Sequence, residues 1–279
     1  MQYPNKINDF RAHLKTLGRQ GSSIESYCQA VKLFYSRYDL LTEETAYAYK
    51  EGLVDTLKPR SINLRVVGLN RYMKFMGEKD FKLSGVREQQ KPFLENVISF
   101  ADYEFLKKKL REDGDLRSLL LISLLGATGA RVSEIVKFKA EHIRAGHVDF
   151  YGKGKKYRRV YIPRSTQETA LPILAAMGVE SGHVFRNSRI KRGKGYGKPM
   201  STRGIAGIIK TIGQKYGIDK EVMHPHSFRH LFAKQFLLRH NDIVFLADLM
   251  GHEELETTRI YLRKTATEQR AIVDEIIDW

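Results

Sequence analysis

Apolar side chains in the first 80 residues recur every three or four positions, the period of a helix with one buried face. The clearest face lies between residues 24 and 38, after a candidate capping box formed by Ser22 and Glu25. Two later helices begin at residue types typical of helix starts, Thr42 and Pro59. Four helices are therefore expected, at residues 7–17, 22–38, 42–49 and 59–76.

Residues 83–94 show little periodicity and many polar groups. Such a composition is typical of a segment between domains, so this stretch is predicted to be a linker. It would separate a compact helical domain at residues 1–82 from a larger domain at residues 95–279.

The second domain begins with a helix that Ser99 is placed to cap. The run SLLLISLLGATGA is apolar on all sides but too short to cross a bilayer, which predicts a buried helix ending near Gly126–Gly129. The run HVDFYGKGKKYRRVYIP alternates apolar and polar residues, which predicts a β-hairpin or a short three-stranded sheet. The last third is helical in pattern. The predicted fold class is therefore mainly α with a small antiparallel β-sheet.

Charge indicates the class of partner. Lysine and arginine number 48 against 32 acidic residues, a net charge of +16 with a pI near 9.7. Residues 1–90 hold 15 basic and 10 acidic groups and residues 91–279 hold 33 and 22, so both parts are basic. An excess of this kind favours a polyanion, with nucleic acid first and an anionic membrane surface second.

Several other classes are disfavoured. No apolar run approaches about 18 residues and the start of the chain is polar, so neither a membrane span nor a secretory signal is expected. The single cysteine, Cys28, allows no internal disulfide and no cysteine-rich zinc site. There is no GxxxxGK[ST] phosphate loop. The expected location is the cytoplasm, with no cofactor and no metal.

The stretch HPHSFRH, from His224 to His230, contains three histidines that resemble a metal site. The arginine among them argues against that reading. His226 and Arg229 are three residues apart at the start of a predicted helix, where they share a face and where anions are favoured. Arginine binds phosphate oxygens with two parallel donors, so a phosphate fits this pair better than a metal.

Four other residues are candidates for chemistry, and each has a plainer alternative. Arg131 follows a glycine turn in TGARVSEI, but it could simply pair with Glu134. Lys153 lies at the tip of the predicted hairpin, where a solvated turn lysine is the common case. His252 follows Gly251, a helix C-cap, and Tyr261 lies in TTRIY, where a core tyrosine is common.

Together these residues form an ordered set. ATGARVSE, a GKGK hairpin, HSFRH, LMGH and TTRIY occur in this order. The set resembles the tyrosine recombinase (integrase) family, of Xer-like or phage type. The resemblance covers residues 95–279, and the helical first 80 residues are similar in size and character to the core-binding domain of that family. A separate arm-binding domain is not expected.

The resemblance implies a two-domain clamp on duplex DNA and a site-specific recombinase that needs no metal or nucleotide. Tyr261 would attack the scissile phosphate and form a 3′-phosphotyrosyl bond. Arg131 and Arg229 would hold the non-bridging oxygens, and Lys153 would protonate the leaving 5′-oxygen. His226 would assist proton transfer and His252 would hydrogen-bond the phosphate. Two supporting residues are implied beside these, Glu134 and His230, while His224 has no assigned role.

Further partners follow from the same resemblance. The C-terminal helix at residues 266–279 would dock in a neighbouring protomer to give a tetramer on DNA, although it could instead pack on its own core. Accessory DNA-bending proteins are further candidate partners, and the cytoplasmic location would be the nucleoid. The predicted DNA-binding residues are Arg60, Arg65, Lys155, Lys156, Arg158, Arg159, Arg186, Arg189, Lys191, Arg192, Lys194 and Arg203.

Three rival activities stay open at this point. They are a catalytically silent DNA-binding relative, an enzyme like type IB topoisomerases and a metal-dependent nuclease that uses HPHSFRH. The biological outcome, whether integration, excision, inversion or dimer resolution, is also open.

Overall fold

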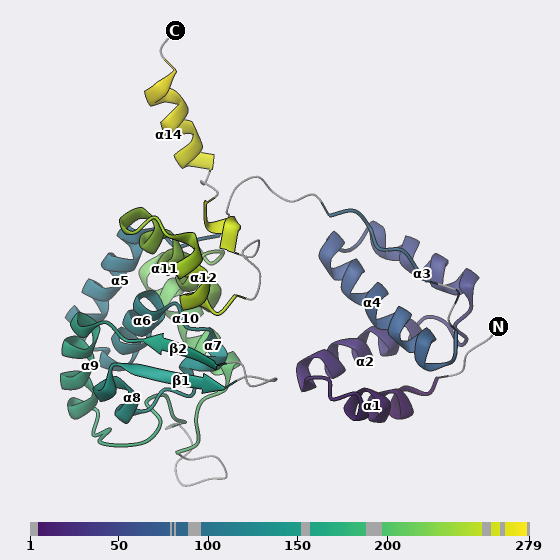
Figure 1. Cartoon of the computed structure of the whole chain (residues 1–279), viewed down its shortest axis with the longest axis horizontal. Coiled ribbons are helices and arrows are strands. Elements are labelled where there is room, and N and C mark those ends of the chain that lie inside the picture. Colours follow the sequence, from purple (N-terminus) through teal and green to yellow (C-terminus); the bar gives the residue numbers. More distant parts are fainter. Residues whose placement is uncertain are drawn as a thin grey trace. The chain divides into compact units, whose positions relative to one another are not determined.

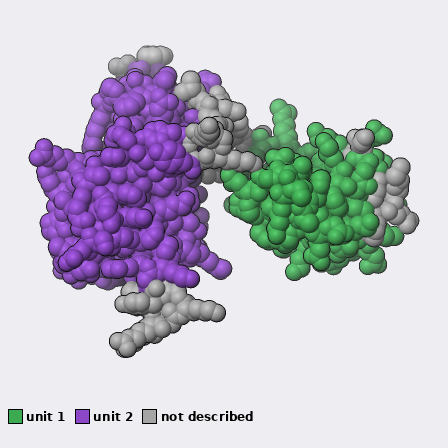
Figure 2. Space-filling model, turned by 60° about the horizontal axis from the view of Figure 1, so that its bottom comes forward, with its two compact units in different colours: residues 1–90 green, residues 91–279 purple. Residues whose placement is uncertain are grey.

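The chain forms two compact units, residues 1–90 and residues 91–279 (Figures 1 and 2). This computed structural model describes residues 5–78, 80, 82–88, 96–151, 157–187, 197–252, 258–262 and 266–277. The unit boundary at residues 90 and 91 falls inside the segment expected as a linker.

The first unit is built from four helices, α1 (Ile7–Thr16), α2 (Gly21–Tyr35), α3 (Glu43–Val54) and α4 (Pro59–Phe75). Its core is rich in aromatic side chains. Phe10 meets Tyr72 edge to face with ring centroids 5.2 Å apart, and Phe34 meets Tyr49 at the same separation. Helices α2 and α4 pack closely because α4 has Gly68, where an added Cβ would lie 2.5 Å from that of Ala30.

The expected helix starts in this unit have mixed outcomes. Thr42 caps α3 by accepting a hydrogen bond from the Thr45 amide at 3.1 Å, which confirms the prediction. The prediction of a capping box at Ser22 and Glu25 is wrong. Helix α2 already begins at Gly21, and the Glu25 carboxylate pairs with Arg11 of α1 instead.

Two asparagines of α4 hold the chain that leaves the first unit. Asn70 accepts from the amide of Leu83 at 2.9 Å and donates to its carbonyl at 2.8 Å. Asn63 makes the same pair of bonds with Val86, at 2.8 and 3.0 Å. Seven helical residues rise about 10.5 Å and three extended residues span about 10 Å, so the two pairs are in register. The first part of the expected linker is therefore bound to α4.

The second unit is organised around one buried helix, α6 (Leu116–Thr128). Helix α6 packs against α5 (Phe100–Glu112), α9 (Arg164–Ala176), α10 (Thr202–Tyr216) and α11 (Pro225–Arg239). Ser99 caps α5 by accepting from the Asp102 amide at 2.9 Å, as predicted. The all-round apolar pattern of α6 follows from this position, because every face of the helix is covered.

The hairpin consists of β1 (His147–Tyr151) and β2 (Tyr157–Tyr161), preceded by the short helices α7 (Val132–Ile135) and α8 (Ala140–Ala145). The strands pair antiparallel with Asp149 opposite Arg159, and they form a two-stranded sheet in the described part of the chain. Val148 and Val160 are buried on one face of the hairpin. The fold class, mainly α with a small antiparallel sheet, is confirmed.

The chain ends in α12 (Ile243–Met250), the 3-10 turn η1 (Ile260–Leu262) and α14 (Ala266–Ile276). In α14 the side chains of Val273 and Ile276 are 52% and 60% exposed. None of the helices in the described residues is long and apolar enough to cross a membrane.

Candidate active site

Arg131 lies at the start of α7, one residue after the turn that closes α6. Gly129 ends α6 in the left-handed conformation, with φ 58°. The Glu134 carboxylate accepts from the Arg131 amide at 2.7 Å and from its guanidinium at 3.2 Å. The Arg131 side chain stays 42% exposed, so the pairing orients it without burying it.

Arg229, on α11, is almost completely buried, with 2% of its surface exposed. Its guanidinium donates to the carbonyls of Gly129 and Met250, the latter at 2.6 Å. These carbonyls are at the C-terminal ends of α6 and α12, where helix dipoles favour a cation. Burial, followed by the charges of Arg131 and Arg158, lowers the Arg229 pKa to about 10. Arg229 is therefore a buried cation stabilised mainly by carbonyl dipoles.

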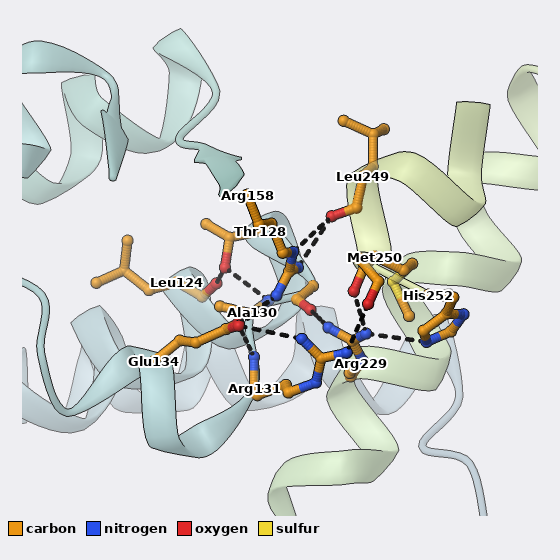
Figure 3. A network of polar contacts seen from close by, with 12 residues as sticks. Leu124, Thr128, Ala130, Arg131, Glu134, Arg158, Arg229, Leu249, Met250 and His252 are labelled. Carbon is orange, nitrogen blue, oxygen red and sulfur yellow. Dashed lines mark hydrogen bonds and ion pairs between the residues drawn. The ribbon is translucent and has the colours of Figure 1, made fainter. Parts of the chain in front are cut away.

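The C-terminal end of α12 is where three arginines meet (Figure 3). Gly251 has φ 60° and, as predicted, caps the helix. The amides of Gly251 and His252 bond back to Asp248 and Ala247, the pattern of a Schellman motif. The next three carbonyls accept from arginine side chains, and these pairs are Leu249 with Arg158, Met250 with Arg229 and Gly251 with Arg131.

His252 follows this cap and is held from both ring nitrogens. Arg229 can only donate, so the His252 Nε2 atom accepts from it at 3.0 Å. Nδ1 then carries the hydrogen and donates to Thr258 Oγ1 at 2.8 Å. Burial and the charges of Arg229 and Arg131 lower the His252 pKa to about 4. The ring is therefore neutral at neutral pH.

The start of α11 shows what His224 does. His224 is the N-cap, and its Nδ1 accepts from the Ser227 amide at 3.1 Å ahead of Pro225 at the first helical position. The Ser227 hydroxyl accepts from the Ile98 amide at 2.7 Å and so joins this helix start to the beginning of the second unit. The Pro225 signal was present in the sequence, but histidine is not a usual cap residue.

Tyr261 is 4% exposed and lies beside two histidines. Its ring centroid is 5.2 Å from that of His230 and 6.1 Å from that of His252, which it stacks on at 12°. Burial raises the Tyr261 pKa, against the opposing effect of Arg229 and Arg131. His226 is exposed and packs edge to face on His230 at 4.1 Å. Residues from η1, α11 and the α12 cap are thus brought together.

Comparison with known families identifies the family of the chain. The family model described as "Phage integrase family" matches residues 96–268. The chain belongs to the phage integrase family. Tyrosine recombinase XerA of Pyrococcus furiosus is 30% identical over 275 residues, which are 96% of this chain and 92% of that protein. The chain is a site-specific tyrosine recombinase.

Solved structures share the fold of this recombinase. A lambda integrase dimer bound to a COC′ core site has a TM-score of 0.70 at 16% identity, covering 91% of this chain and 75% of that one. The Tn1549 transposon integrase in complex with transposon right end DNA has a TM-score of 0.67 at 15% identity, covering 97% and 99%.

Arg158 has partners that differ from the DNA contact expected for it. Its side chain is only 10% exposed and forms an ion pair with Glu134 at 2.5 Å. It also donates to the Leu249 carbonyl at 2.9 and 3.2 Å. The sequence shows a basic strand but cannot show that one of two adjacent arginines points inward.

The other basic candidates vary in exposure. Arg60 and Arg203 are exposed in the first turns of α4 and α10, and Arg65 and Arg186 are partly buried. Arg159 pairs with Asp149 at 2.7 Å on the outer face of the hairpin. Seven candidates lie outside the described residues, namely Lys153, Lys155, Lys156, Arg189, Lys191, Arg192 and Lys194.

The geometry gives this recombinase a cationic site beside a buried tyrosine. Arg131 and Arg229 donate to consecutive carbonyls at the α12 cap, and His252 follows that cap with a lowered pKa. The described residues hold no group of three or more histidine, cysteine or carboxylate side chains that could bind a metal. Such an arrangement can bind a phosphate and stabilise the charge that develops during its transfer.

Proposed function

We propose that this recombinase cuts and rejoins duplex DNA through a covalent 3′-phosphotyrosyl bond to Tyr261. The Tyr261 oxygen would attack the scissile phosphorus and lose its proton. The bond from phosphorus to the 5′-oxygen would break, and that oxygen would take a proton and leave as a 5′-hydroxyl. Attack by the 5′-hydroxyl of a partner duplex would reverse these steps. The phosphodiester energy is kept in the phosphotyrosine, so the cycle consumes no nucleotide.

The observation that carries this proposal is the buried Tyr261 beside His252 and the guanidinium of Arg229. A phenol with a pKa near ~10 is a weak nucleophile at neutral pH. Burial makes its ionisation harder still, so bound cations must assist it. Arg229 and Arg131 supply that charge without moving, which is the condition for effective transition-state stabilisation.

The remaining roles are proposed on residue type and position. Lys153 would protonate the leaving oxygen, and His226, which is exposed next to His230, would assist proton transfer. His252 would hydrogen-bond the phosphate through Nε2, which requires that Nε2 carry the hydrogen and that its contact with Arg229 open when the phosphate binds. Glu134 would orient Arg131, as its two bonds to that residue suggest.

DNA would be held by both units, with residues 1–82 and 95–279 as the two DNA-binding domains. Support comes from the basic charge of each part and from exposed arginines such as Arg60 and Arg203. The side chains of Val273 and Ile276 in α14 are about half exposed, which suits docking in a neighbouring protomer and a tetramer on DNA. Accessory DNA-bending proteins and a nucleoid location in the cytoplasm belong to the same proposal.

The test is covalent trapping on a nicked half-site duplex in EDTA. After cleavage the short fragment that carries the new 5′-hydroxyl, between the break and the nick, diffuses away, so religation cannot occur and a protein–DNA adduct accumulates. We expect an adduct with the unaltered chain and none with Tyr261→Phe. Cutting that needs a divalent metal and leaves no adduct would overturn the proposal in favour of a nuclease. Relaxation of plasmids that lack a specific site would indicate an enzyme like type IB topoisomerases.

A further inference from the structure

Arg158 connects three parts of the site that are far apart in sequence (Figure 3). It is on β2, in the strand that follows the hairpin tip. Its Nη1 atom reaches Glu134 of α7, and its Nε and Nη2 atoms both reach the Leu249 carbonyl at the end of α12. One side chain therefore joins the strand, the short helix and the helix cap.

The charge of Arg158 is already matched. The Glu134 carboxylate is buried with it, and Arg158 together with the bonds from Arg131 holds the Glu134 pKa below its usual value against the effect of burial. A buried ion pair of this kind adds little net stability, because the cost of desolvating both charges offsets their attraction. Arg158 is thus set apart from Arg131, whose side chain is 42% exposed.

The contact with α12 is tight on both sides. An added Cβ at Gly251 would lie 2.4 Å from Cδ of Arg158, so the Arg158 side chain packs directly on the helix cap. Because Leu249, Met250 and Gly251 are consecutive, a shift of the cap at Leu249 would also move the carbonyls that orient Arg229 and Arg131. His252 follows the same cap and would move with it.

We propose that Arg158 is a positioning residue of this recombinase, which holds the α12 cap against α7 so that Arg131, Arg229 and His252 face one phosphate. The proposal rests on the function proposed above. Arg158 does not touch the phosphate itself. The planar guanidinium is required because its two edges bond Glu134 and Leu249 together, which the single nitrogen of a lysine cannot do.

The test compares Arg158→Met and Arg158→Lys with Arg144→Met in the full chain. Arg144 is a matched control, because it also donates to a backbone carbonyl, that of Glu180, and its loss removes the same charge away from the site. The readouts are the single-turnover rate of adduct formation at saturating half-site DNA, the affinity for that DNA and the melting temperature.

We expect both Arg158 variants to form adduct about 10²-fold more slowly, because a misplacement near 1 Å costs about that much. Affinity for DNA should stay within about twofold, since phosphate contacts elsewhere dominate it. Arg144→Met should keep the unaltered rate. If Arg158→Met does not fold, Arg158→Lys, which keeps the charge beside Glu134, supplies the result. An unaltered rate in Arg158→Lys would overturn the proposal, because charge alone would then suffice.

A substrate with a neutral methylphosphonate at the scissile position separates positioning from general damage. It carries one charge less and so depends less on a correctly placed Arg131. The defect of Arg158→Met should shrink on it, as that of Arg131→Ala should. The double variant Arg131→Ala with Arg158→Met should be slower than Arg131→Ala by less than the factor that Arg158→Met alone causes, because only Arg229 and His252 are then left to be misplaced. An equal defect on both substrates would overturn the proposal. Absence of any adduct from the unaltered chain would instead overturn the proposed function.

Discussion

The two units of the chain bury different kinds of side chain. Among the described residues, those buried in the first unit are apolar or aromatic, such as Phe34 and Tyr72. Every buried polar or charged residue of the described chain lies in the second unit, including Glu134, Arg229 and His230. The first unit is stabilised by apolar burial and aromatic packing, whereas the second encloses charge.

This difference shows that the second unit keeps a positive charge in its interior at a cost in free energy. Burying a guanidinium costs solvation free energy, and carbonyl dipoles offset only part of that cost. The lowered pKa of Arg229 reflects the remainder. A phosphate at the site would supply the missing negative charge. The second unit should therefore respond to anions and to pH, while the first should respond mainly to changes of packing.

The largest expected effect is on the packing of the first unit. Phe34→Ala removes a fully buried ring and should lower the free energy of unfolding by about 3–5 kcal/mol. Hydrogen exchange of the α2 and α4 amides would measure this loss. Leu64→Ala is the control, because Leu64 is 51% exposed and its replacement should change the free energy of unfolding by no more than about 0.5 kcal/mol. If the amides of α6 lost as much protection as those of α2 and α4, the two units would unfold together. That result would contradict the separate stabilisation of the two cores.

The next effect is on the charge of the second unit. Arg229→Lys keeps one positive charge but cannot reach the carbonyls of Gly129 and Met250 together. We expect single-turnover cleavage to slow by about 10²–10³, or about 2.7–4 kcal/mol of barrier. Arg144→Lys should leave the rate unchanged. A rate near that of the unaltered chain in Arg229→Lys would mean that the planar fork has no special role.

A smaller effect should appear in the pH dependence of stability. Burial and the neighbouring histidines lower the His230 pKa to about 3. Between about 3 and the unfolded value near 6.5, the unfolded chain holds more protons, so stability is complete above pH 6.5 and falls as the pH drops. At pH 5 the loss is about 2 kcal/mol for His230. Melting curves of His230→Phe should have a smaller slope with pH, and an identical slope would disprove this assignment.

The smallest effect is stabilisation by a free anion. Inorganic phosphate at ten times its dissociation constant should add about 1.4 kcal/mol to the second unit. The melting temperature of that unit should rise in phosphate relative to chloride at equal ionic strength, and less so in Arg229→Lys. If only the melting temperature of the first unit rose, the anion would bind outside the site at the α12 cap.

Local features were predictable because their causes are local. The periodicity of α2, the caps at Thr42 and Ser99 and the turn at Gly251 depend on residues within one helical turn. The hairpin followed from alternation over a few residues. The capping box at Ser22 failed because Glu25 has a better partner in Arg11 of another helix.

Long-range partners were not predictable from pattern. Arg158 and Leu249 are 91 positions apart, and nothing in a basic strand indicates that its guanidinium faces a helix end. His224 had no assigned role from the sequence, yet it caps α11. The order of Arg131, Arg229, His252 and Tyr261 was recognisable only as a family resemblance. The structure adds that all four converge on the cap of α12.

The two asparagine clamps on α4 determine how long the tether between the units is. The chain is fixed at Val86 by Asn63 and again at Ile98 by Ser227. The twelve residue steps between these anchors can span at most about 40 Å. In the proposed clamp, where both units bind one duplex, binding of the first unit would confine the other to a small volume, with an effective concentration of millimolar order at that duplex. Asn63, which is remote from any reacting atom, helps to set that concentration.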